Sequence, residues 1–524
     1  MIHVQLVYNN GYKWFSKNGS VWVKGFIFTP ENQRLREENL INYFAGIESF
    51  DEFQAKLETA NGLFSVVIRK ENRLWAAIDN ARSFPLFYYH TKDDFFLTDN
   101  PDAWGKENIP MVLDEESAIL FRYSGFTAGN KTLLKDVFQL IAGQSICYEE
   151  NKIKTEFHTE FLTDTFFTQT REELKAGLKS VLERAGRRMV EVLAGRQAAI
   201  PLSGGFDSRL MAYLLRKNNY TNVLCYTFGK ENNVEVNNAR RTAENLGYEF
   251  YFVNYDKYKD HVLTDDPDFQ SYVDYSANYS CRPEDQDYFA MKELMKQGKL
   301  SAGTVFIPGH SGAIAGHLLS SSMDKPRFSW IDHAVDDVYS QVYPSKCEMR
   351  IVRENIRFLD RQSAYPAFLL YENWRFQGTT ASTFNFAKIW DFFGFEYLFP
   401  LWDKELFAFF MHVPFRHKYD KNLYKEALSE LFDEFNIYFG AEELYPDKRL
   451  VRKVAFRSKL KRHFPFLKRF VNIWKNDILG AQDYIEGFLR DLKEANIQQK
   501  WMSYNAILSA WYVFQVRKKL EIKK

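Results

Sequence analysis

A short run of small and acidic residues at positions 203–208 is the part of the sequence best suited to chemistry. It reads Ser-Gly-Gly-Phe-Asp-Ser and lies between a predicted buried strand and a predicted helix. The glycines let backbone N–H groups approach an anion, and the positive end of the helix dipole adds to the attraction. A carboxylate at Asp207 repels a bare phosphate, so its presence indicates an intervening Mg²⁺. The run predicts a phosphate-binding loop; the alternative is a serine–glycine turn that caps a helix.

The segments on either side of this run predict a parallel sheet. Apolar strands alternate with helices, and the five elements are expected at 198–202, 209–216, 223–228, 237–246 and 248–253. Such alternation is typical of a doubly wound sheet, in which ligands bind at the carboxyl ends of the strands. A further strand is expected at 304–308 in a mostly helical remainder. Ahead of the sheet, Thr170 and Glu173 predict a capping box for a helix whose apolar stripe runs from 174 to 193.

Residues 1–165 differ in character and predict a sheet-rich α+β domain. Short strands are expected at 20–28, 63–69, 74–79, 86–90, 144–148 and 153–157, with turn signals between them. Only a few segments, such as 37–46 and 115–122, are predicted to be helical there. The expected fold class is α/β overall. We expect three parts: the α+β domain at 1–165, the parallel-sheet domain with a helical C-terminal part at 166–445, and a basic helical extension at 446–524.

The composition fits a large folded protein of the cytoplasm. The 524 residues are 46% hydrophobic, which excludes wholesale disorder, and the net charge of +1 gives no support for a nucleic-acid partner. The four cysteines are far apart and include no CxxC, so neither a disulfide scaffold nor a zinc ribbon is expected. No stretch approaches about 18 uncharged apolar residues, and the first residues lack the pattern of a signal peptide. We therefore expect a cytoplasmic location.

One charge run interrupts this balance near the C-terminus. Between residues 448 and 475 the sequence has eleven Lys and Arg residues and no Asp or Glu. Three interpretations stay open: a solvated cationic face of a helix, contact with an anionic membrane surface, or binding of a polyanionic partner. Phe and Leu residues in the run supply an apolar side for a membrane, although Pro465 breaks or kinks such a helix. A peripheral membrane location is thus left open.

Several segments of the chain resemble the asparagine synthetase family. Residues 201–208 are similar to the pyrophosphate loop of its ATP-pyrophosphatase domain, and Lys421 with the residues after it resembles the family's lysine helix. Further similar segments lie, in order, at 61–64, 79–89, 124–126, 131–137, 140–143, 225–229 and 239–247. The resemblance implies an Ntn-like, glutamine-amidotransferase-like α+β domain followed by a PP-loop domain with a Rossmann-like, doubly wound parallel sheet.

This resemblance implies an ATP- and Mg²⁺-dependent ligase. Members of the family adenylate a small carboxylic acid, and ammonia or an amine then attacks the acyl-adenylate to give an amide, AMP and pyrophosphate. Asp207 is the implied magnesium ligand and Lys421 the implied catalytic lysine, with Lys425 one turn further along the helix. ATP and pyrophosphate are implied to contact Leu202, Ser203, Gly204, Gly205, Asp207, Ser208, Phe228 and Gly229. The expected partners are small molecules, and a homodimer is compatible with the sequence.

The chain departs from the family pattern at three places. Members that use glutamine have a catalytic cysteine directly after Met1, whereas here Ile2 stands at that position and the first cysteine is Cys147. We therefore expect no glutaminase activity, and in this respect the chain resembles β-lactam synthetase. Ala313 stands where a second magnesium-binding aspartate is usual. His310 takes the place of the glutamate or tyrosine that serves the nucleophile, and it is either a general base or a loop residue that only hydrogen-bonds. Carboxylates that could replace the missing aspartate are Glu284, Asp285 and Asp287.

We therefore expect an AMP-forming carbon–nitrogen ligase that uses ammonia or an amine rather than glutamine. Asparagine synthesis from free ammonia and amide formation on another acid both fit this expectation. The alternative is a catalytically degenerate relative that binds a nucleotide or a partner, which the alanine at position 313 favours. Nucleobase thiolation by related loop chemistry is disfavoured, because the chain has no paired cysteines to carry sulfur.

Overall fold

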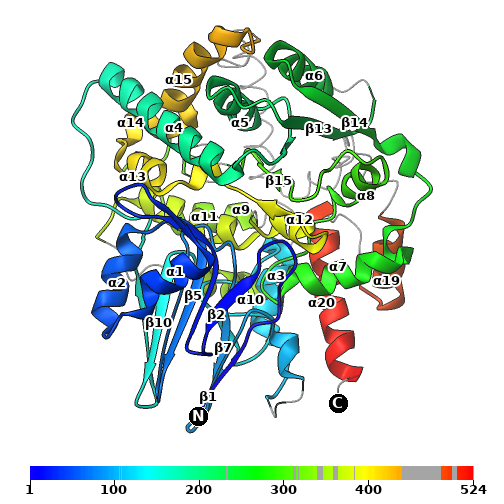
Figure 1. The fold of residues 1–524 in the computed structure, drawn as a ribbon. Coiled ribbons are helices and arrows are strands. Elements are labelled where there is room, and N and C mark those ends of the chain that lie inside the picture. The colour runs from blue at the N-terminus through cyan, green and yellow to red at the C-terminus, as the bar shows by residue number, and fades with distance from the viewer. Residues whose placement is uncertain are drawn as a thin grey trace.

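The computed structural model describes residues 1–105, 107, 109–231, 234–310, 314–316, 318–338, 346–357, 364–382, 384–439, 485–497 and 504–522. Figure 1 shows the N-terminal strands, in blue and cyan, at one end of the molecule and the strands of a second region, mostly in green, at the other. Helices of the C-terminal half lie between and beside the two regions. The basic run at 448–475 and Ala313 lie outside the described residues.

The N-terminal part contains two sheets that take all their strands from residues 1–157. The larger sheet is antiparallel, with strands β2 (Trp14–Lys17), β3 (Val21–Phe28), β4 (Arg34–Arg36), β5 (Asn61–Lys70), β6 (Arg73–Ile78), β10 (Gln144–Glu149) and β11 (Lys152–Phe157). Its order is β11-β10-β6-β5-β3-β2, and β4 pairs with β3. The smaller sheet has the order β1-β8-β7-β9, from strands β1 (Ile2–Gln5), β7 (Phe87–His90), β8 (Phe95–Thr98) and β9 (Phe138–Gln139).

Both faces of the larger sheet are buried, which explains its long apolar strands. Helices α1 (Glu37–Ala45) and α2 (Phe50–Thr59) cover one face, where Phe44, Phe53 and Val66 belong to one buried cluster. The other face packs against the smaller sheet, in a cluster that includes Val67 and Leu97. Neighbouring residues of a strand point to opposite faces, so each face needs its own apolar side chain. The predicted sheet-rich character of this part is confirmed, whereas the sequence pattern missed α2 and short strands such as β1 and β8.

The central part forms a five-stranded parallel sheet, as the alternation of strands and helices predicts. Its strands are β12 (Ala198–Pro201), β13 (Val223–Gly229), β14 (Glu249–Asn254), β15 (Val305–Phe306) and β16 (Glu396–Tyr397), in the order β14-β13-β12-β15-β16. Helices α4 (Arg171–Leu193), α5 (Phe206–Lys217) and α6 (Val234–Leu246) pack around it, and α4 begins with the predicted capping box. The chain runs outward from β12 to β14 and then returns to β15. The loops that follow β12 and β15 therefore meet at the switch point of the sheet.

The other regular elements in the described part of the chain are helices. The remaining α-helices are α3 (Glu115–Ser124), α7 (Pro267–Ala277), α8 (Tyr288–Lys296), α9 (Trp330–Val338), α10 (Lys346–Ile356), α11 (Ala367–Ser382), α12 (Lys388–Phe392), α13 (Lys404–His412), α14 (Phe415–Lys418), α15 (Asn422–Phe432), α19 (Glu486–Glu494) and α20 (Tyr504–Ile522). The 3₁₀ helices are η1 (Pro101–Trp104), η2 (Tyr255–Tyr258), η3 (Leu263–Asp265), η5 (Phe384–Ala387), η6 (Pro400–Trp402), η7 (Tyr419–Lys421) and η8 (Asp433–Phe435). Among the helices described, none is both long and apolar enough to span a membrane.

The last helix, α20, belongs to the main core and falls within the basic helical extension expected at 446–524. Leu508 and Trp511 are almost fully buried, and the helix packs against α3 of the N-terminal part. Near its end, Lys519 Nζ forms an ion pair with Asp102 at 2.6 Å. Apolar residues occur on all sides of this helix, a pattern typical of buried helices rather than of solvated extensions.

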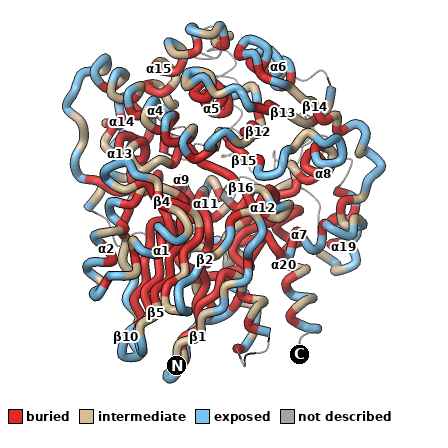
Figure 2. Tube along the Cα trace, viewed as in Figure 1, coloured by how far each residue is buried: buried red, intermediate tan, exposed pale blue. Residues whose placement is uncertain are grey.

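The N-terminal and central parts share one continuous buried cluster, and Figure 2 shows buried chain in both sheet regions and in the helices between them. Asp391 joins the two parts. It is 0% exposed, and it accepts hydrogen bonds from the backbone N–H groups of Gly11 and Tyr12 at 3.1 and 3.3 Å. Tyr275 Oη donates to the same carboxylate. Gly11 lies so close to the central part that an added Cβ would be 2.2 Å from the oxygen of Phe395, so only glycine fits there.

Candidate active site

A cavity of about 370 Å³ opens at the switch point of the parallel sheet. It lies between the segments that follow β12, β13 and β15, and Phe386 and Trp390 form a further side. Seven residues implied by the sequence line it: Leu202, Ser203, Gly205, Asp207, Ser208, Phe228 and His310. Gly204 belongs to the same loop and Gly229 to strand β13, but neither residue lines the cavity. The topology thus brings the serine–glycine loop (residues 203–208), β13 and His310 to one site.

The serine–glycine loop is held by hydrogen bonds of its own serines. Ser208 Oγ accepts from Ser203 N at 3.1 Å, and Ser203 Oγ accepts from Gly205 N at 3.2 Å. Helix α5 begins at Phe206, and its N-cap makes no side-chain hydrogen bond, so its first N–H groups suit an anion. Gly309, from the loop after β15, approaches so closely that an added Cβ would lie 2.2 Å from Ser208 N. This glycine therefore allows the two loops to touch.

Arg209 supports the serine–glycine loop, although the sequence analysis did not select it. Its guanidinium donates to the carbonyl oxygens of Gly205 at 3.2 Å, Gly204 at 3.0 Å and Ile437 at 2.8 Å. The side chain is 1% exposed, and its charge lies 4.9 Å from the centre of the Phe206 ring. A trans peptide carries its C=O and N–H on opposite sides, so the N–H groups of Gly205 and Phe206 point away from the arginine. Arginines on predicted helices usually face solvent, so only the tertiary contacts identify this one.

Replacement of Arg209 by methionine should weaken both the loop and the fold. The change removes the donors to three carbonyl groups, and a hydrogen bond to a charged group is worth about 1.5–3 kcal/mol. We expect the free energy of unfolding to fall by about 3 kcal/mol or more. If the loop binds ATP, as the resemblance implies, the dissociation constant for ATP should rise by about tenfold or more. Urea unfolding and calorimetric titration measure the two effects. Arg216→Met, on the same helix but half-exposed, is the control, and equal behaviour of the two variants would contradict the supporting role.

Lys421 and Asp207, both implied by the sequence, are in direct contact beside the cavity. Lys421 Nζ donates to Asp207 Oδ2 at 2.8 Å. Asp420 and Lys421 have φ values of 54° and 58°, in the left-handed region that residues other than glycine rarely adopt. Such strain often occurs where a fold holds a functional side chain. Lys425 lies one turn further along α15, where burial lowers the pKa of its ammonium.

Two of the three carboxylates expected to replace the missing aspartate line the cavity, and one does not. Glu284 and Asp287 lie in the cavity wall, and Tyr226 Oη donates to Asp287 Oδ1 at 3.1 Å. Burial raises the pKa of Asp287 to about 7, and the nearby Glu284 adds to the rise. Asp285 instead accepts a hydrogen bond from Tyr504 of α20 and is not part of the lining. Only Glu284 and Asp287 thus stay candidates for a cation in the cavity.

The carboxylates present fit a magnesium ion that is held partly by a nucleotide. Across the described ranges, no three His, Cys, Asp or Glu side chains come together in a metal-binding group. Mg²⁺ commonly uses one or two carboxylates together with phosphate oxygens and waters. Asp207 lies on the serine–glycine loop and lines the cavity, so it can serve as such a carboxylate. Ala313, the position expected to lack a ligand, lies outside the described residues.

His310 lies in the cavity wall with its ring edge-on to Phe386. Its backbone oxygen accepts a hydrogen bond from Trp402 Nε1 at 2.8 Å, and its ring Nδ1 has no hydrogen-bond partner among the described residues. Burial lowers the pKa of the imidazole to about 4, although Asp207 opposes the shift. The ring is therefore neutral at pH 7, because burial disfavours its charged form.

Replacement of His310 by alanine should separate two chemical steps. If the neutral ring takes a proton from the attacking nitrogen, amide formation should slow by about 10²-fold while ATP–pyrophosphate exchange changes little. With a pKa near 4, His310 should also produce no inflection between pH 6 and 7 in the rate of amide formation. Rapid-quench measurement of each step from pH 5 to 8 gives both results. An equal slowing of the two steps would instead assign His310 to the packing of its loop.

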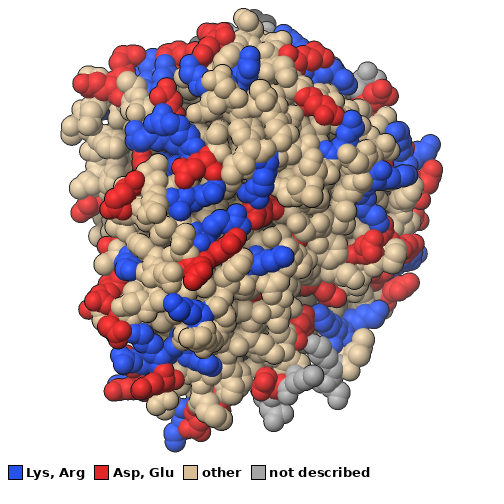
Figure 3. All heavy atoms as spheres, in the orientation of Figure 1, with Lys and Arg blue, Asp and Glu red and all other residues tan. Residues whose placement is uncertain are grey.

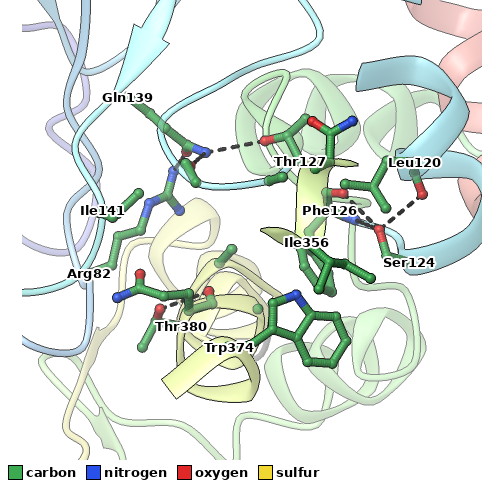
Figure 4. A pocket seen from close by; sticks show the side chains of 16 residues that line it. Arg82, Leu120, Ser124, Phe126, Thr127, Gln139, Ile141, Ile356, Trp374 and Thr380 are labelled. Atoms are coloured by element: carbon green, nitrogen blue, oxygen red, sulfur yellow. Dashed lines mark hydrogen bonds between the residues drawn. The ribbon is translucent and has the colours of Figure 1, made fainter. Parts of the chain in front are cut away.

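A second cavity lies where the N-terminal part meets helices α10 and α11, and Figure 4 shows its lining. Arg82 donates to Gln139 Oε1 on one side, and Gln139 Nε2 donates to Thr127 Oγ1 at 3.2 Å. Ile356 and Trp374 lie on the other side. The volume is about 30 Å³. Because this is close to the volume of one water molecule, the cavity is too small for a substrate.

No protein-family model matches the chain, and no curated protein matches it. One similar solved structure is described as the allosteric regulatory enzyme of purine biosynthesis; it has 10% identity and a TM-score of 0.21, covering 64% of this chain and 75% of that chain. Another is glutamine phosphoribosylpyrophosphate amidotransferase from B. subtilis, complexed with ADP and GMP; it has 8% identity and a TM-score of 0.19, covering 62% of this chain and 70% of that chain. At such low TM-scores these likenesses establish neither the fold nor the activity of this chain.

Proposed function

We propose that the chain is an ATP-dependent carbon–nitrogen ligase that forms AMP and pyrophosphate. The serine–glycine loop carries the proposal, because it lies at the switch point of the sheet and at the N-terminus of α5, with Lys421 bound to Asp207. A loop in this position supports the binding of nucleotide phosphates. The resemblance of its residues to the asparagine synthetase family supplies the reaction class.

In the proposed reaction, a carboxylate oxygen of the acid attacks the α-phosphorus of ATP, and pyrophosphate leaves. The backbone N–H groups and the hydroxyls of Ser203 and Ser208 would bind the departing pyrophosphate, and Lys421 would stabilise its negative charge. Mg²⁺ at Asp207 would neutralise phosphate charge. The nitrogen of ammonia or an amine then attacks the acyl carbon, and AMP leaves as the C–N bond forms. His310, neutral at pH 7, would accept the proton that the nitrogen loses.

Ammonia or an amine is the proposed nitrogen source, because the N-terminal part offers poor groups for glutamine hydrolysis. Its one cysteine, Cys147, is buried, and burial raises the pKa of the thiol. Thiols of this kind are weak nucleophiles. We infer that this part of the chain is a scaffold for the central part.

Pyrophosphate release with ATP, Mg²⁺ and a panel of small carboxylic acids tests the function. We expect pyrophosphate release that depends on one class of acid, with an amide formed from ammonia or an amine. When glutamine is supplied instead of ammonia or an amine, we expect no release of glutamate. Calorimetric titration with ATP runs in parallel. ATP binding without acid-dependent turnover would favour the degenerate, nucleotide-binding alternative. If ATP neither binds nor turns over, the assignment of the loop is wrong.

A further inference from the structure

A groove on the seam between the N-terminal part and helices α4 and α13 is separate from the candidate active site. Its volume is about 640 Å³, within the usual range of small-molecule sites. Residues from 28–32 and 58–61 form one wall, and residues of α4 and α13 form the other. None of them lines the cavity at the switch point. Figure 3 shows Lys and Arg side chains gathered over α4 and the neighbouring seam, with acidic side chains between them.

The charged side chains of this seam groove do not balance. Six of them line it: Arg184, Arg187, Arg188, Lys404, Glu58 and Glu405. Arg188 forms ion pairs with Asp403 at 2.6 Å and with Glu405 at 2.9 Å, and Arg184 forms one with Glu405 at 2.5 Å. Among the described residues, Arg187 and Lys404 have no carboxylate within ion-pair distance. Within the described part of the chain, two cations on neighbouring helices therefore have no ion-pair partner.

Lys404 is the less solvated of these two cations. Its Nζ donates to the backbone oxygen of Leu57 at 3.0 Å, which leaves further N–H bonds of the ammonium for another acceptor. Burial lowers its pKa to about 8, and only the charge of Glu58 opposes this shift. A desolvated cation without a counter-ion is unfavourable, and an anion beside it would relieve that cost.

We propose that the seam groove binds a small anion with at least two negative charges, of the phosphate or dicarboxylate type, at Arg187 and Lys404. The planar guanidinium of Arg187 suits two oxygens of one anion, and the ammonium of Lys404 supplies a compact second charge. Arg184 and Arg188 add positive potential, although their nearest carboxylates offset much of it. The proposal does not depend on the proposed ligase activity, because it concerns a different set of residues.

Calorimetric titration of the full chain with sulfate at pH 7 and low salt is the direct test. We expect Arg187→Gln and Lys404→Met each to weaken binding about tenfold or more, because each removes a charge-assisted hydrogen bond. Arg216→Gln, outside the groove, should bind sulfate as the wild type does. Titrations with phosphate and succinate then distinguish a tetrahedral oxyanion from a dicarboxylate. Arg187 lies on the exposed face of α4, so its replacement tests the site even if the Lys404 variant fails to fold.

The pH dependence of sulfate binding supplies a second test, because sulfate keeps its charge from pH 7 to 9. The titratable or permanently charged groups near the ammonium of Lys404 are Glu58, His158, Arg184, Arg187, Arg188 and Glu405. The anion needs a protonated lysine, so wild-type affinity should fall about tenfold as pH rises from 7 to 9. Lys404→Arg should bind sulfate with little change over that range, since arginine stays charged. Wild-type affinity in Arg187→Gln and Lys404→Met, or no sulfate binding at millimolar concentration, would overturn the proposal.

Discussion

Replacement of Asp207 by alanine should abolish the formation of AMP and pyrophosphate while the protein stays folded. Asp207 is the carboxylate of the serine–glycine loop, it lines the cavity, and its Oδ2 accepts from Lys421 Nζ at 2.8 Å. Its loss removes the proposed magnesium ligand and the partner that holds the lysine. Removal of one stabilising group in such sites costs about 10²–10³-fold in rate, and we expect at least that loss in acid-dependent pyrophosphate release.

Two further variants show whether Asp207 acts through its charge and through Lys421. Asp207→Asn keeps an acceptor for the lysine but removes the negative charge, so it should be nearly as inactive as the alanine variant. Lys421→Met should also lose most of the activity. The double variant with Lys421→Met and Asp207→Asn should lose little more activity than either single variant, because the two residues act as a unit. Thermal unfolding followed by circular dichroism provides the folding control. Turnover within about threefold of wild type in Asp207→Ala would remove this residue from the site.

Of the substitutions named here, replacement of Asp391 by alanine should destabilise the fold most. The carboxylate is 0% exposed and accepts from the backbone of Gly11 and Tyr12. Burial opposes its ionisation, but the charges of Lys388 and Lys24 hold its pKa below the usual range. Removing one member of a buried charge network costs about 3–5 kcal/mol, because the others lose their counter-ion. We expect the free energy of unfolding in urea to fall by about that amount.

The pH dependence of stability checks the same carboxylate. A carboxyl group whose pKa is lowered in the folded state stabilises the fold above the pKa of the unfolded chain, and this contribution is lost as pH falls below it. The difference in unfolding free energy between wild type and Asp391→Ala should therefore shrink as pH falls below about 4. The free energy of unfolding of Asp391→Asn, which keeps hydrogen-bonding capacity without the charge, should lie between the values for wild type and Asp391→Ala. A loss below about 1 kcal/mol at pH 7 would show that Asp391 does not hold the two parts together.

Local pattern alone was enough to predict the parallel sheet and the serine–glycine loop. Both depend on neighbours in the sequence: apolar residues that repeat at the period of a strand or helix, and glycines that permit a tight turn. The capping box ahead of α4 is likewise a matter of residues three apart, and it is present as predicted. Short edge strands such as β16 (Glu396–Tyr397) escaped prediction, because two residues carry no period and the strand forms only by pairing with β15.

The burial and partners of side chains required the tertiary structure. Arg209 has the appearance of a surface residue on an amphipathic helix, yet it binds carbonyl oxygens of the serine–glycine loop and of Ile437, 228 residues away in sequence. The imidazole of His310 has an ordinary pKa in water, and its enclosure beside Phe386 brings the pKa to about 4. Neither effect can be read from sequence, because solvation depends on all the atoms nearby and not on the residue type.

The sequence by itself therefore predicted the main strands and helices of the parallel sheet, the capping box of α4 and the serine–glycine turn, because each depends on residues close together in the chain. The tertiary structure alone decided that Asp391 binds the N-terminal loop and that α20 fills the core. It also decided that Arg187 and Lys404 line the seam groove with no carboxylate of the described residues within ion-pair distance. The physical reason is the same in each case. Hydrogen bonds and ion pairs act over a few ångströms in space, so residues hundreds of positions apart become partners only when the chain has folded.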